Sequence, residues 1–367
     1  MKKRRIVLAS ILKPVDDTRM VEKLGVSLAK FNGQVSVIGY PSTSPSAHDT
    51  ITRVALKPYM RLSLGRVLAP LHVLLKCIKV KPELLIVNTH ELLLVAIAIR
   101  ILFGCKIVYD IQENYALNLK HTAAFPVVVR PVLAAIVRLK ETLTAPFFHA
   151  FLLAEKCYAD QLSFVRNKAV VLENKVVLQE GFRRLPQPGK IRLLFTGTIA
   201  ESTGVFQAID LTEKLHAVNS NVELEIMGFC ALPATLSRIR QRISGLPFVT
   251  LIGGERPVPH SRIFEAIRHA SFGLIYYPPA PHIASKVPTK LYEYLGCRLP
   301  ILLQPVPGWL ALAKPSNGAL AVDFQNPDAE EILTEITSRQ FCTGTPTGVT
   351  WDEEEARLLQ WVVKIFV

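Results

Sequence analysis

Two lysines and a glutamate interrupt an otherwise apolar stretch near the end of the chain. In Ser285–Leu303, SKVPTKLYEYLGCRLPILL, they are Lys286, Lys290 and Glu293. Ammonium groups bind phosphate as point charges, whereas a carboxylate accepts hydrogen bonds from the hydroxyls of a sugar. The stretch therefore predicts a phosphate or diphosphate site, with Glu293 placed to hold a sugar diol. A capped helix with an exposed glutamate and two solvated lysines is the structural alternative.

The same stretch carries the signals of a helix start. Pro288 presets the backbone angle φ at the beginning of a helix, and Thr289 can cap it. The unpaired amide groups and the dipole at that end favour an anion. We therefore expect Lys290 in the first turn and Glu293 one turn further along, beside the apolar Leu291.

Further polar residues follow predicted strands in the first half of the chain. They are Lys13, Asp17 and Arg19 after the first strand, His90 at the end of LLIVNT, and Asp110 and Glu113 after KIVY. Because ligands of open α/β sheets bind at the carboxyl ends of strands, these side chains are candidates for contacts with an acceptor or with a donor diphosphate. The structural alternatives are helix capping by Asp16 or Asp17, a solvated Arg19, and ordinary packing of His90.

Short apolar runs alternate with longer amphipathic segments along nearly the whole chain. This alternation predicts parallel sheets with helices on both faces, and the length of 367 residues favours two domains. Glu180–Lys190, EGFRRLPQPGK, breaks the pattern with Gly, Pro and charges and is the expected linker. We predict two doubly wound α/β domains that face a central cleft, at residues 1–182 and 190–345. A C-terminal helix at residues 351–367 is expected to cross back to the first domain.

Positive charge is concentrated in the first half. Residues 1–150 hold 21 Lys or Arg and nine Asp or Glu, whereas residues 151–367 hold 22 and 21. Ile51–Pro82 has seven basic residues and Ala116–Lys140 has four, and neither segment has an acid. Basic residues interleaved with apolar ones are typical of a surface that binds an anionic membrane. A solvated face and a nucleic-acid surface are the alternatives, but the aromatic platforms and recognition motifs that favour nucleic acid are missing.

Several classes of site and location are disfavoured. The six cysteines are scattered without a CxxC pair, and no His stands at metal-ligand spacing, so we expect a reducing compartment without a zinc site or disulfide framework. The start, MKKRRIVLAS, predicts a first strand rather than a signal peptide, because its apolar run is short. Leu92–Gly104 is the most apolar later stretch, and its 13 residues predict a buried helix rather than a membrane span. The expected location is the cytoplasm.

The second half resembles the nucleotide-sugar domain of the GT-B glycosyltransferases of the mostly retaining type called group 1 or family 4. The landmarks occur in the family's order. They are a strand ending in Gly197 with Gly204 before a helix, the strand VELEIMGF with Gly228, the unit from FVTLIGG to FGLIYYP, and PTKLYEYLGCRLPILL. The first half is more weakly similar through NTHELLL, VYDIQENY and AVVLEN. Together these segments span nearly the whole chain, although no single motif is diagnostic.

The resemblance implies roles for individual residues. Glu293 corresponds to the family's ribose-binding glutamate. The expected donor-binding residues are Gly197, Thr198, Thr203, Gly204, Ser285, Lys286, Pro288, Thr289, Lys290, Leu291 and Glu293. The expected catalytic residues are His90, Glu113 and Lys290, and those of the acceptor side are Lys13, Asp17, Arg19 and Asp110.

The chain also departs from the family pattern. The positions are Thr198, Thr203, Gln112 and Ser285, where Arg, Lys, His and Glu respectively are frequent in the family. The two missing basic groups normally stabilise negative charge on a leaving diphosphate. Lys286, Lys290 and the backbone amides near Gly204 are the expected substitutes.

The resemblance implies a retaining hexosyltransferase that needs no metal or other cofactor and uses a nucleoside diphosphate sugar. The sequence has no D-x-D motif to hold a metal. The expected acceptor is lipid-linked or a cell-surface glycan of polysaccharide biosynthesis, at the cytoplasmic membrane face, where the basic first half makes the protein peripheral. A second hypothesis is a non-catalytic subunit that binds a nucleotide sugar or a partner enzyme, which the missing basic residues favour. A sugar-nucleotide epimerase on the same fold is a third.

Overall fold

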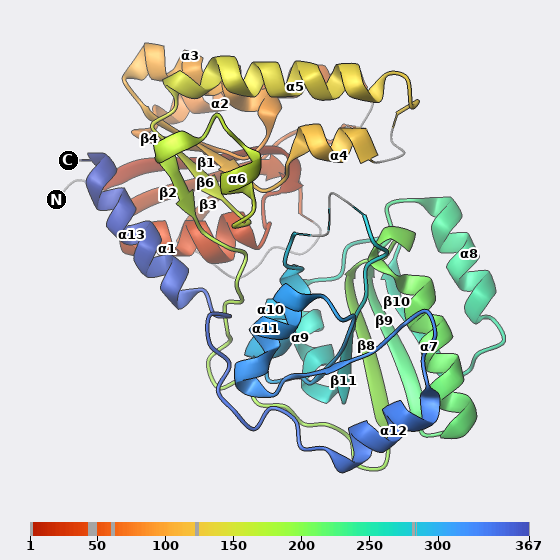
Figure 1. Cartoon of the computed structure of the whole chain (residues 1–367). Helices are drawn as coiled ribbons and strands as arrows, with labels where there is room; N and C mark the ends of the chain where they lie inside the picture. Colours follow the sequence, from red (N-terminus) through yellow and green to blue (C-terminus); the bar gives the residue numbers. More distant parts are fainter. Residues whose placement is uncertain are drawn as a thin grey trace. The chain divides into compact units, whose positions relative to one another are not determined.

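The computed structural model describes residues 3–42, 50–59, 63–121, 125–280, 283 and 285–366. The chain forms two compact units (Figure 1). The first comprises Met1–Asn174 together with Trp351–Val367, and the second comprises Lys175–Thr350. The last helix therefore belongs to the first unit although it follows the second in sequence. Arg61, one of the basic residues of Ile51–Pro82, lies outside the described residues.

The described residues of the first unit form a parallel sheet of seven strands in the order β3-β2-β1-β4-β5-β6-β7. The strands are β1 (Arg4–Pro14), β2 (Gly33–Tyr40), β3 (Ile51–Ala55), β4 (Leu84–Val87), β5 (Lys106–Ile111), β6 (Ala150–Leu153) and β7 (Ala169–Val171). Central strands such as β4, with the sequence LLIV, are wholly buried because both faces of the sheet are covered. β1 confirms the strand predicted at the start of the chain.

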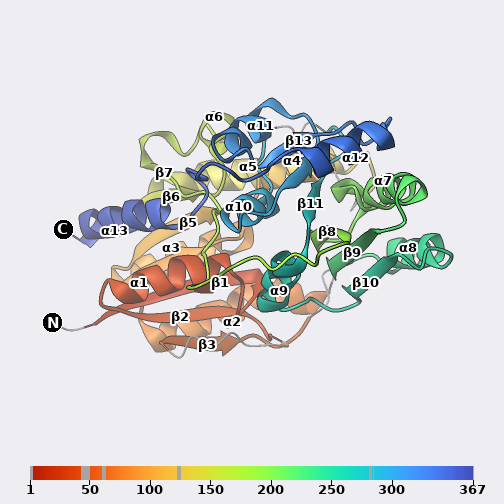
Figure 2. The ribbon, with the colours of Figure 1, turned by 90° about the horizontal axis from the view of Figure 1, so that it is seen from below.

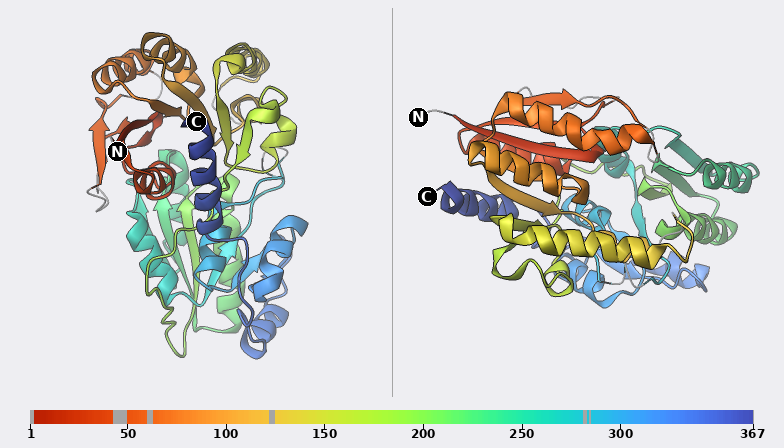
Figure 3. Two further views of the ribbon diagram at one scale, coloured as in Figure 1. Left: turned by 90° about the vertical axis from the view of Figure 1, so that its left-hand side faces the viewer. Right: turned by 90° about the horizontal axis from the view of Figure 1, so that it is seen from above.

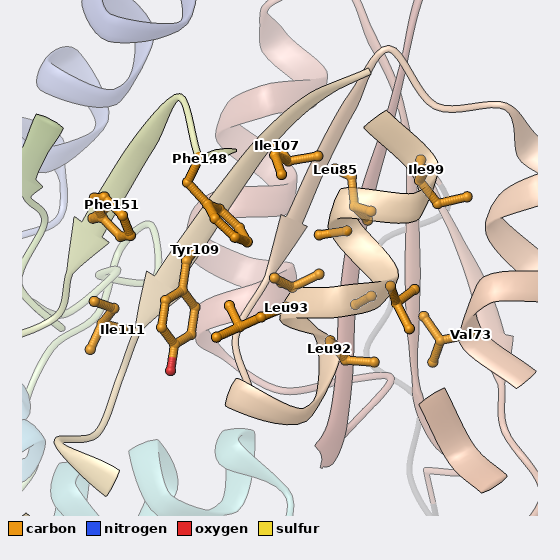
Figure 4. Packing of buried hydrophobic residues seen from close by; sticks show 14 of the residues in the cluster. Val73, Leu85, Leu92, Leu93, Ile99, Ile107, Tyr109, Ile111, Phe148 and Phe151 are labelled. Atoms are coloured by element: carbon orange, nitrogen blue, oxygen red, sulfur yellow. The ribbon is translucent and has the colours of Figure 1, made fainter. Parts of the chain in front are cut away.

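Helices cover this sheet on two faces. They are α1 (Val26–Lys30), α2 (Leu64–Val80), α3 (Leu93–Phe103), α4 (Tyr115–His121), α5 (Arg130–Thr144), α6 (Tyr158–Gln161) and α13 (Asp352–Phe366). On one face, α3 packs between α2 and α5. Figure 4 shows the core beneath them, in which Val73, Leu93 and Ile99 gather over Leu85 and Ile107 of the strands. On the other face, α13 lies beside α1, as Figure 2 shows.

The described residues of the second unit form a parallel sheet of six strands in the order β10-β9-β8-β11-β12-β13. The strands are β8 (Ile191–Thr198), β9 (Val222–Phe229), β10 (Val249–Gly254), β11 (Phe272–Ile275), β12 (Ile301–Leu303) and β13 (Ala319–Ala321). The helices are α7 (Val205–Val218), α8 (Pro233–Ile243), α9 (His260–His269), α10 (Thr289–Gly296), α11 (Pro307–Ala313) and α12 (Ala329–Ser338). Both sheets have a doubly wound order, which confirms the predicted fold class.

Two sequence expectations about single segments can be compared with the fold. Glu180–Lys190 contains neither helix nor strand, but it lies within the second unit, because the two units divide between Asn174 and Lys175. The helix predicted within Leu92–Gly104 is present as α3, but the prediction that it is buried is wrong in part, because Leu94 and Ile101 on it are exposed. Among the described residues, no helix is both long and apolar enough to cross a membrane.

Candidate functional site

The second sheet reverses its strand order between β8 and β11. These strands are neighbours, and the chain proceeds from β8 to β9 on one side and from β11 to β12 on the other. At such a point the loops that leave the carboxyl ends of the two strands diverge, and ligands of open α/β sheets bind there. The residues that follow Thr198 and Ile275 are therefore the first place to look for a site.

At the carboxyl ends of three strands of this sheet, glycines leave the backbone without side chains. Gly197, Gly228 and Gly253 lie in register on the adjacent strands β8, β9 and β10. A Cβ atom on Gly228 would collide with the carbonyl oxygen of Gly197, and one on Gly253 would collide with that of Gly228. The close approach explains why only glycine fits at these two positions, and it keeps side chains from covering this edge. Gly253 was not among the predicted site residues.

The loop after β8 leads directly into α7. Gly204 caps this helix with φ of 78°, in the left-handed region that favours glycine. A Cβ there would lie 2.6 Å from the carbonyl oxygen of Tyr276, so the loop packs against the end of β11. The hydroxyl of Thr203 accepts from the amide of Ala200 at 3.1 Å and lies 2.8 Å from the carbonyl oxygen of Thr198, to which it donates. Thr203 therefore stabilises the turn itself.

The helix α10 packs against β8, the strand that leads into this loop. Its N-cap is Pro288, with extended backbone and no side-chain cap, so the prediction that Thr289 caps the helix is wrong. The helix is held against β8 by Tyr294, whose hydroxyl accepts from the Thr196 amide at 3.1 Å and lies 2.8 Å from the Thr196 hydroxyl. Gly273 on β11 makes room for this ring, because a Cβ there would collide with it.

Lys290, in the first turn of α10, carries a buried amine. Its Nζ lies 4.0 Å from the ring centroid of Phe195 on β8 and 5.4 Å from that of Tyr277. Among the described residues, Nζ has no hydrogen-bond partner. Burial lowers the pKa of Lys290 to about 7, and the Glu293 carboxylate opposes that shift. The alternative of a solvated lysine is therefore wrong at this position, and the amine is placed to gain from any anion that reaches it.

Glu293 lies one turn along α10 and is paired with a histidine that sequence reasoning missed. His260 Nε2, at the start of α9, lies 3.0 Å from Glu293 Oε1. Both side chains are mostly buried, at 19% and 13% exposure. Because His260 contacts only one carboxylate oxygen, the other has capacity to accept from a ligand hydroxyl. No local signal in the sequence could link these two residues, since 33 positions separate them.

The segment before α10 contributes backbone and one further lysine. The carbonyl oxygen of Lys286 accepts from the indole N–H of Trp309 at 2.8 Å, which ties this segment to α11. The Lys286 side chain is half-buried and Ser285 is exposed. Leu291 is fully buried in the core of the second unit, so only its backbone can meet a ligand.

Solved structures similar to this chain are similar over nearly its whole length. Sucrose-phosphate synthase from Thermosynechococcus elongatus has a TM-score of 0.74 at 14% identity, with 99% of each chain covered. Anabaena Alr3699/HepE, solved in complex with UDP and glucose, has a TM-score of 0.66 at 12% identity, with 98% of each covered. WaaG, a glycosyltransferase involved in lipopolysaccharide biosynthesis, has a TM-score of 0.65 at 12% identity, with 98% of this chain and 99% of that one covered.

The chain has the GT-B fold. No family model and no curated protein matches its sequence. At identities of 12–14%, the similarity to these structures is a similarity of fold. The two Rossmann-like units of the GT-B fold correspond to the two sheets described above, and the site at α10 lies in the second.

In the first unit of this GT-B chain, Arg19 and Asp110 form a buried ion pair. Arg19 Nη2 lies 2.6 Å from Asp110 Oδ1, and both side chains are almost wholly inaccessible. Arg19 also donates to the carbonyl oxygen of Leu172 and to the side chain of Asn174. The alternative of a solvated Arg19 is therefore wrong. Arg19 thereby links Asp110 on β5 to Leu172 and Asn174. A contact of Arg19 or Asp110 with the acceptor stays a prediction.

His90 is held among charged neighbours in the first unit. Its Nδ1 lies 2.8 Å from Lys140 Nζ and its Nε2 lies 3.5 Å from the Glu91 carboxylate. Burial lowers the pKa of His90 to about 4, with the nearby Lys140 acting in the same direction. The imidazole is therefore neutral at pH 7, and its Nδ1 accepts from the ammonium. The ring also meets Tyr115 of α4 edge-on.

The remaining predicted residues of the first unit lie in separate local groups. Glu113 accepts from the Asn118 side chain at 2.7 Å. Lys13 Nζ lies 3.9 Å from the Asp17 carboxylate, which also accepts from the Met20 amide at 3.0 Å. The Asp17 carboxylate thus stabilises the first turn of the helix at Arg19–Gly25, although the N-cap of that helix is Thr18. The structure places Lys290 and Glu293 within one turn of α10 and divides the predicted residues of the first unit among four places.

Two cavities in the second unit lie away from the start of α10. One of about 590 Å³ lies at the other end of that helix, against Arg184 and Arg298. The Arg184 guanidinium there is already bonded to the carbonyl oxygens of Arg298, Ala270 and Ser271. Another, of about 620 Å³, lies between α7 and the segment around Gln325. Neither contains an unpartnered buried charge comparable with Lys290.

Proposed function

We propose that the protein is a glycosyltransferase that takes its sugar from a nucleoside diphosphate sugar. The observation that carries the proposal is the amine of Lys290, buried without a hydrogen-bond partner among the described residues at the start of α10. A buried, unpartnered cation costs stability unless a ligand supplies the opposite charge. A diphosphate supplies it. Because the chain has the GT-B fold, the diphosphate compound that we propose is a nucleotide sugar.

The donor is proposed to lie along the first two turns of α10. The diphosphate would meet the amide groups of the first turn and the amine of Lys290, where the helix dipole also favours an anion. The ribose hydroxyls would donate to the Glu293 oxygen that His260 leaves open. The bare glycine edge beside Gly197 lets a ligand approach the backbone closely. HepE, which shares the fold, was solved with UDP and with UDP-glucose.

Charge on the leaving diphosphate is proposed to be stabilised by lysine side chains of this segment. Thr198 and Thr203 stand where basic groups are frequent in similar enzymes, and the Thr203 hydroxyl is engaged in the turn. Lys290 and Lys286 are the cations nearest in sequence to the α10 start and would take over this role. We propose that transfer retains anomeric configuration and proceeds without a metal. Catalytic roles for His90 and Glu113 stay predictions.

The acceptor is proposed to be a lipid-linked or cell-surface glycan reached at the cytoplasmic face of the membrane. The support is electrostatic. Residues 1–150 carry a net charge of +12, from 21 basic and nine acidic residues, whereas the rest of the chain is nearly neutral. Such a surface is attracted to anionic lipid headgroups.

A non-catalytic subunit that binds a nucleotide sugar is the second candidate. The observation that favours it is the replacement of two basic residues by Thr198 and Thr203 and of a glutamate by Ser285. The two functions differ in turnover. Release of the nucleoside diphosphate from a bound donor, dependent on an acceptor, identifies a transferase, and binding without release identifies the subunit.

The first test is a thermal-shift screen with UDP, GDP, ADP and dTDP and their sugars. A ligand at about 100 times its Kd adds about 2.7 kcal/mol of stability, so the cognate nucleotide should raise Tm by several degrees. Glu293→Ala should abolish this shift. Glu330→Ala, an exposed glutamate on α12, is the matched control and should keep it. If no nucleotide stabilises a well-folded sample, or if Glu293→Ala responds like wild type, the proposed donor site is refuted.

A further inference from the structure

Helix α2 exposes a regular apolar stripe. Leu64, Leu68, Leu71 and Leu75 follow one another at intervals of four, three and four residues, which places them on one side of the helix. All four are exposed, and Leu64 reaches 81%. The opposite side of α2, with Val73 and its neighbours at helical spacing, is buried against the sheet. The helix is therefore apolar on both sides, although the fold covers only one.

Helix α5 repeats the arrangement with the same spacing. Val132, Ile136, Leu139 and Leu143 are separated by four, three and four residues and are all at least half exposed. Their opposite side, which includes Ala134, Val137 and Glu141, faces the protein. The residues that lead into α5 are apolar as well, and Val128 among them is 86% exposed.

Helix α3 joins the two stripes into one surface. It packs between α2 and α5, and Figure 3, in its right-hand view, shows the three helices side by side in front of the sheet. Leu94 and Ile101 on α3 are exposed, at 63% and 77%. Exposed large apolar side chains are common singly, but a contiguous field of them marks a docking surface. We call the exposed sides of α2, α3 and α5 the three-helix face.

The charges on these helices indicate what the three-helix face contacts. The helices contain seven basic residues, Arg66, Lys76, Lys79, Arg100, Arg130, Arg138 and Lys140, and one acid, Glu141. The buried Glu141 pairs with Arg138 at 3.3 Å, and Arg66 pairs with Glu91, so the surface charge of these helices rests mainly on exposed lysines such as Lys76 and Lys79. Lys79 follows Leu75 by four residues and continues the α2 stripe as an exposed cation. A second copy of this chain would present the same excess of positive charge and be repelled. An anionic partner is favoured.

We propose that the three-helix face inserts its apolar side chains into the interfacial region of a membrane with anionic headgroups, while its lysines contact those headgroups. Amphipathic helices that lie in the plane of a bilayer combine exposed apolar side chains with basic ones in this way. Lysine stems can rest on the apolar region while the ammonium reaches the headgroups. Among the described helices none is long and apolar enough to span a bilayer.

This docking surface is distinct from the proposed donor site. The three-helix face belongs to the first unit and α10 to the second, so they share no residues. The inference goes beyond the proposed function by assigning the membrane contact to particular helices. Failure of nucleotide binding would leave it intact, and failure of membrane binding would leave the donor site intact.

The test is sedimentation of the full chain with vesicles of phosphatidylcholine, with and without phosphatidylglycerol, at two salt concentrations. We expect the wild type to bind the anionic vesicles, more weakly at high salt. Leu71→Glu with Ile136→Glu should lower the partition coefficient at least tenfold. The matched control is Leu232→Glu, which changes an exposed leucine of the second unit and should bind like wild type. Circular dichroism confirms that each variant is folded.

A second variant separates the charge from the apolar contact. Lys76→Glu with Lys79→Glu should lower binding to anionic vesicles tenfold or more, because each basic group near the surface contributes about 1 kcal/mol. The proposal is overturned if wild type does not bind anionic vesicles, or if the apolar double variant binds as well as wild type. It is also overturned if light scattering shows a dimer that the apolar double variant abolishes, since the face then binds a second copy.

Discussion

Replacement of Lys290 by methionine should stabilise the free protein and weaken its binding of nucleotide. Methionine has nearly the length of lysine and keeps an apolar stem over the ring of Phe195, where a thioether is also a favourable neighbour. The change removes an amine that burial disfavours and that has no hydrogen-bond partner among the described residues. Opposite effects on stability and on binding are the signature of a group retained for a ligand.

The magnitude follows from the pKa of Lys290. Burial lowers this pKa from 10.5 to about 7, and each pKa unit corresponds to about 1.4 kcal/mol. The upper limit of the free-energy penalty for burying the charged amine is therefore on the order of 5 kcal/mol. The ring faces of Phe195 and Tyr277 attract the ammonium and offset part of this penalty. We expect Lys290→Met to gain about 1–3 kcal/mol at pH 6, which is a rise in Tm of a few degrees.

The gain should depend on pH with a defined sign. Between pH 7 and 10.5 the unfolded chain holds a proton on Lys290 that the folded chain has lost, so stability rises with pH over this window. The penalty is complete below pH 7 and disappears toward pH 10.5. The difference in stability between Lys290→Met and wild type should therefore be largest at pH 6 and fall to roughly 40% of that value by pH 9.

Urea unfolding at pH 6, 7, 8 and 9 measures this difference. Lys214→Met, which changes an exposed lysine of α7, is the control and should run parallel to wild type at every pH. Calorimetry in two buffers adds a second reading, because binding of the nucleoside diphosphate at pH 8 should take up about one proton in wild type and none in Lys290→Met. Parallel stability curves of wild type and Lys290→Met, together with unchanged nucleotide affinity, would refute the reasoning.

Three further substitutions test the contacts that build the units. Gly204→Ala should cost about 1–3 kcal/mol in urea unfolding, because φ is 78° there and the new Cβ meets the end of β11, whereas Gly308→Ala should be nearly neutral, since that site is open. Tyr294→Phe should cost about 1–3 kcal/mol by leaving an amide of β8 unpaired, and a loss below about 0.5 kcal/mol would contradict the anchoring role. Asp110→Asn should destabilise by about 3–5 kcal/mol, because it leaves the buried Arg19 charge without its partner; an unfolding midpoint equal to that of wild type would show the ion pair to be unimportant.

The helix start at Pro288 could be predicted from the sequence because its signals are local. Proline angles and the spacing of Glu293 within one turn depend on neighbouring residues only. The identity of the N-cap residue was not predicted correctly even here, since Pro288, and not Thr289, occupies that position. The doubly wound sheets were predictable for a related reason, as strands buried on both faces must be apolar throughout.

The pairing of His260 with Glu293 and the burial of Lys290 could not be predicted. Each depends on residues far away in the sequence, and the amine of Lys290 is desolvated by a ring on β8 that lies 95 positions earlier. A lysine in the first turn of a helix has the same local pattern whether it is solvated or buried. The sequence predicted the residue as a cation, and only the packing of α10 on β8 shifts its pKa toward 7.

The sequence by itself determined the order of strands and helices, the basic character of the first half and the residue types at the start of α10. Only the tertiary structure decided which side of each helix is covered. In α2 and α5, apolar residues line both sides, so hydrophobic spacing alone cannot distinguish the core from the surface. The sheet side of these helices is buried through Val73 and Ala134 and the other side is exposed, because no further layer of the described structure covers the helices from outside.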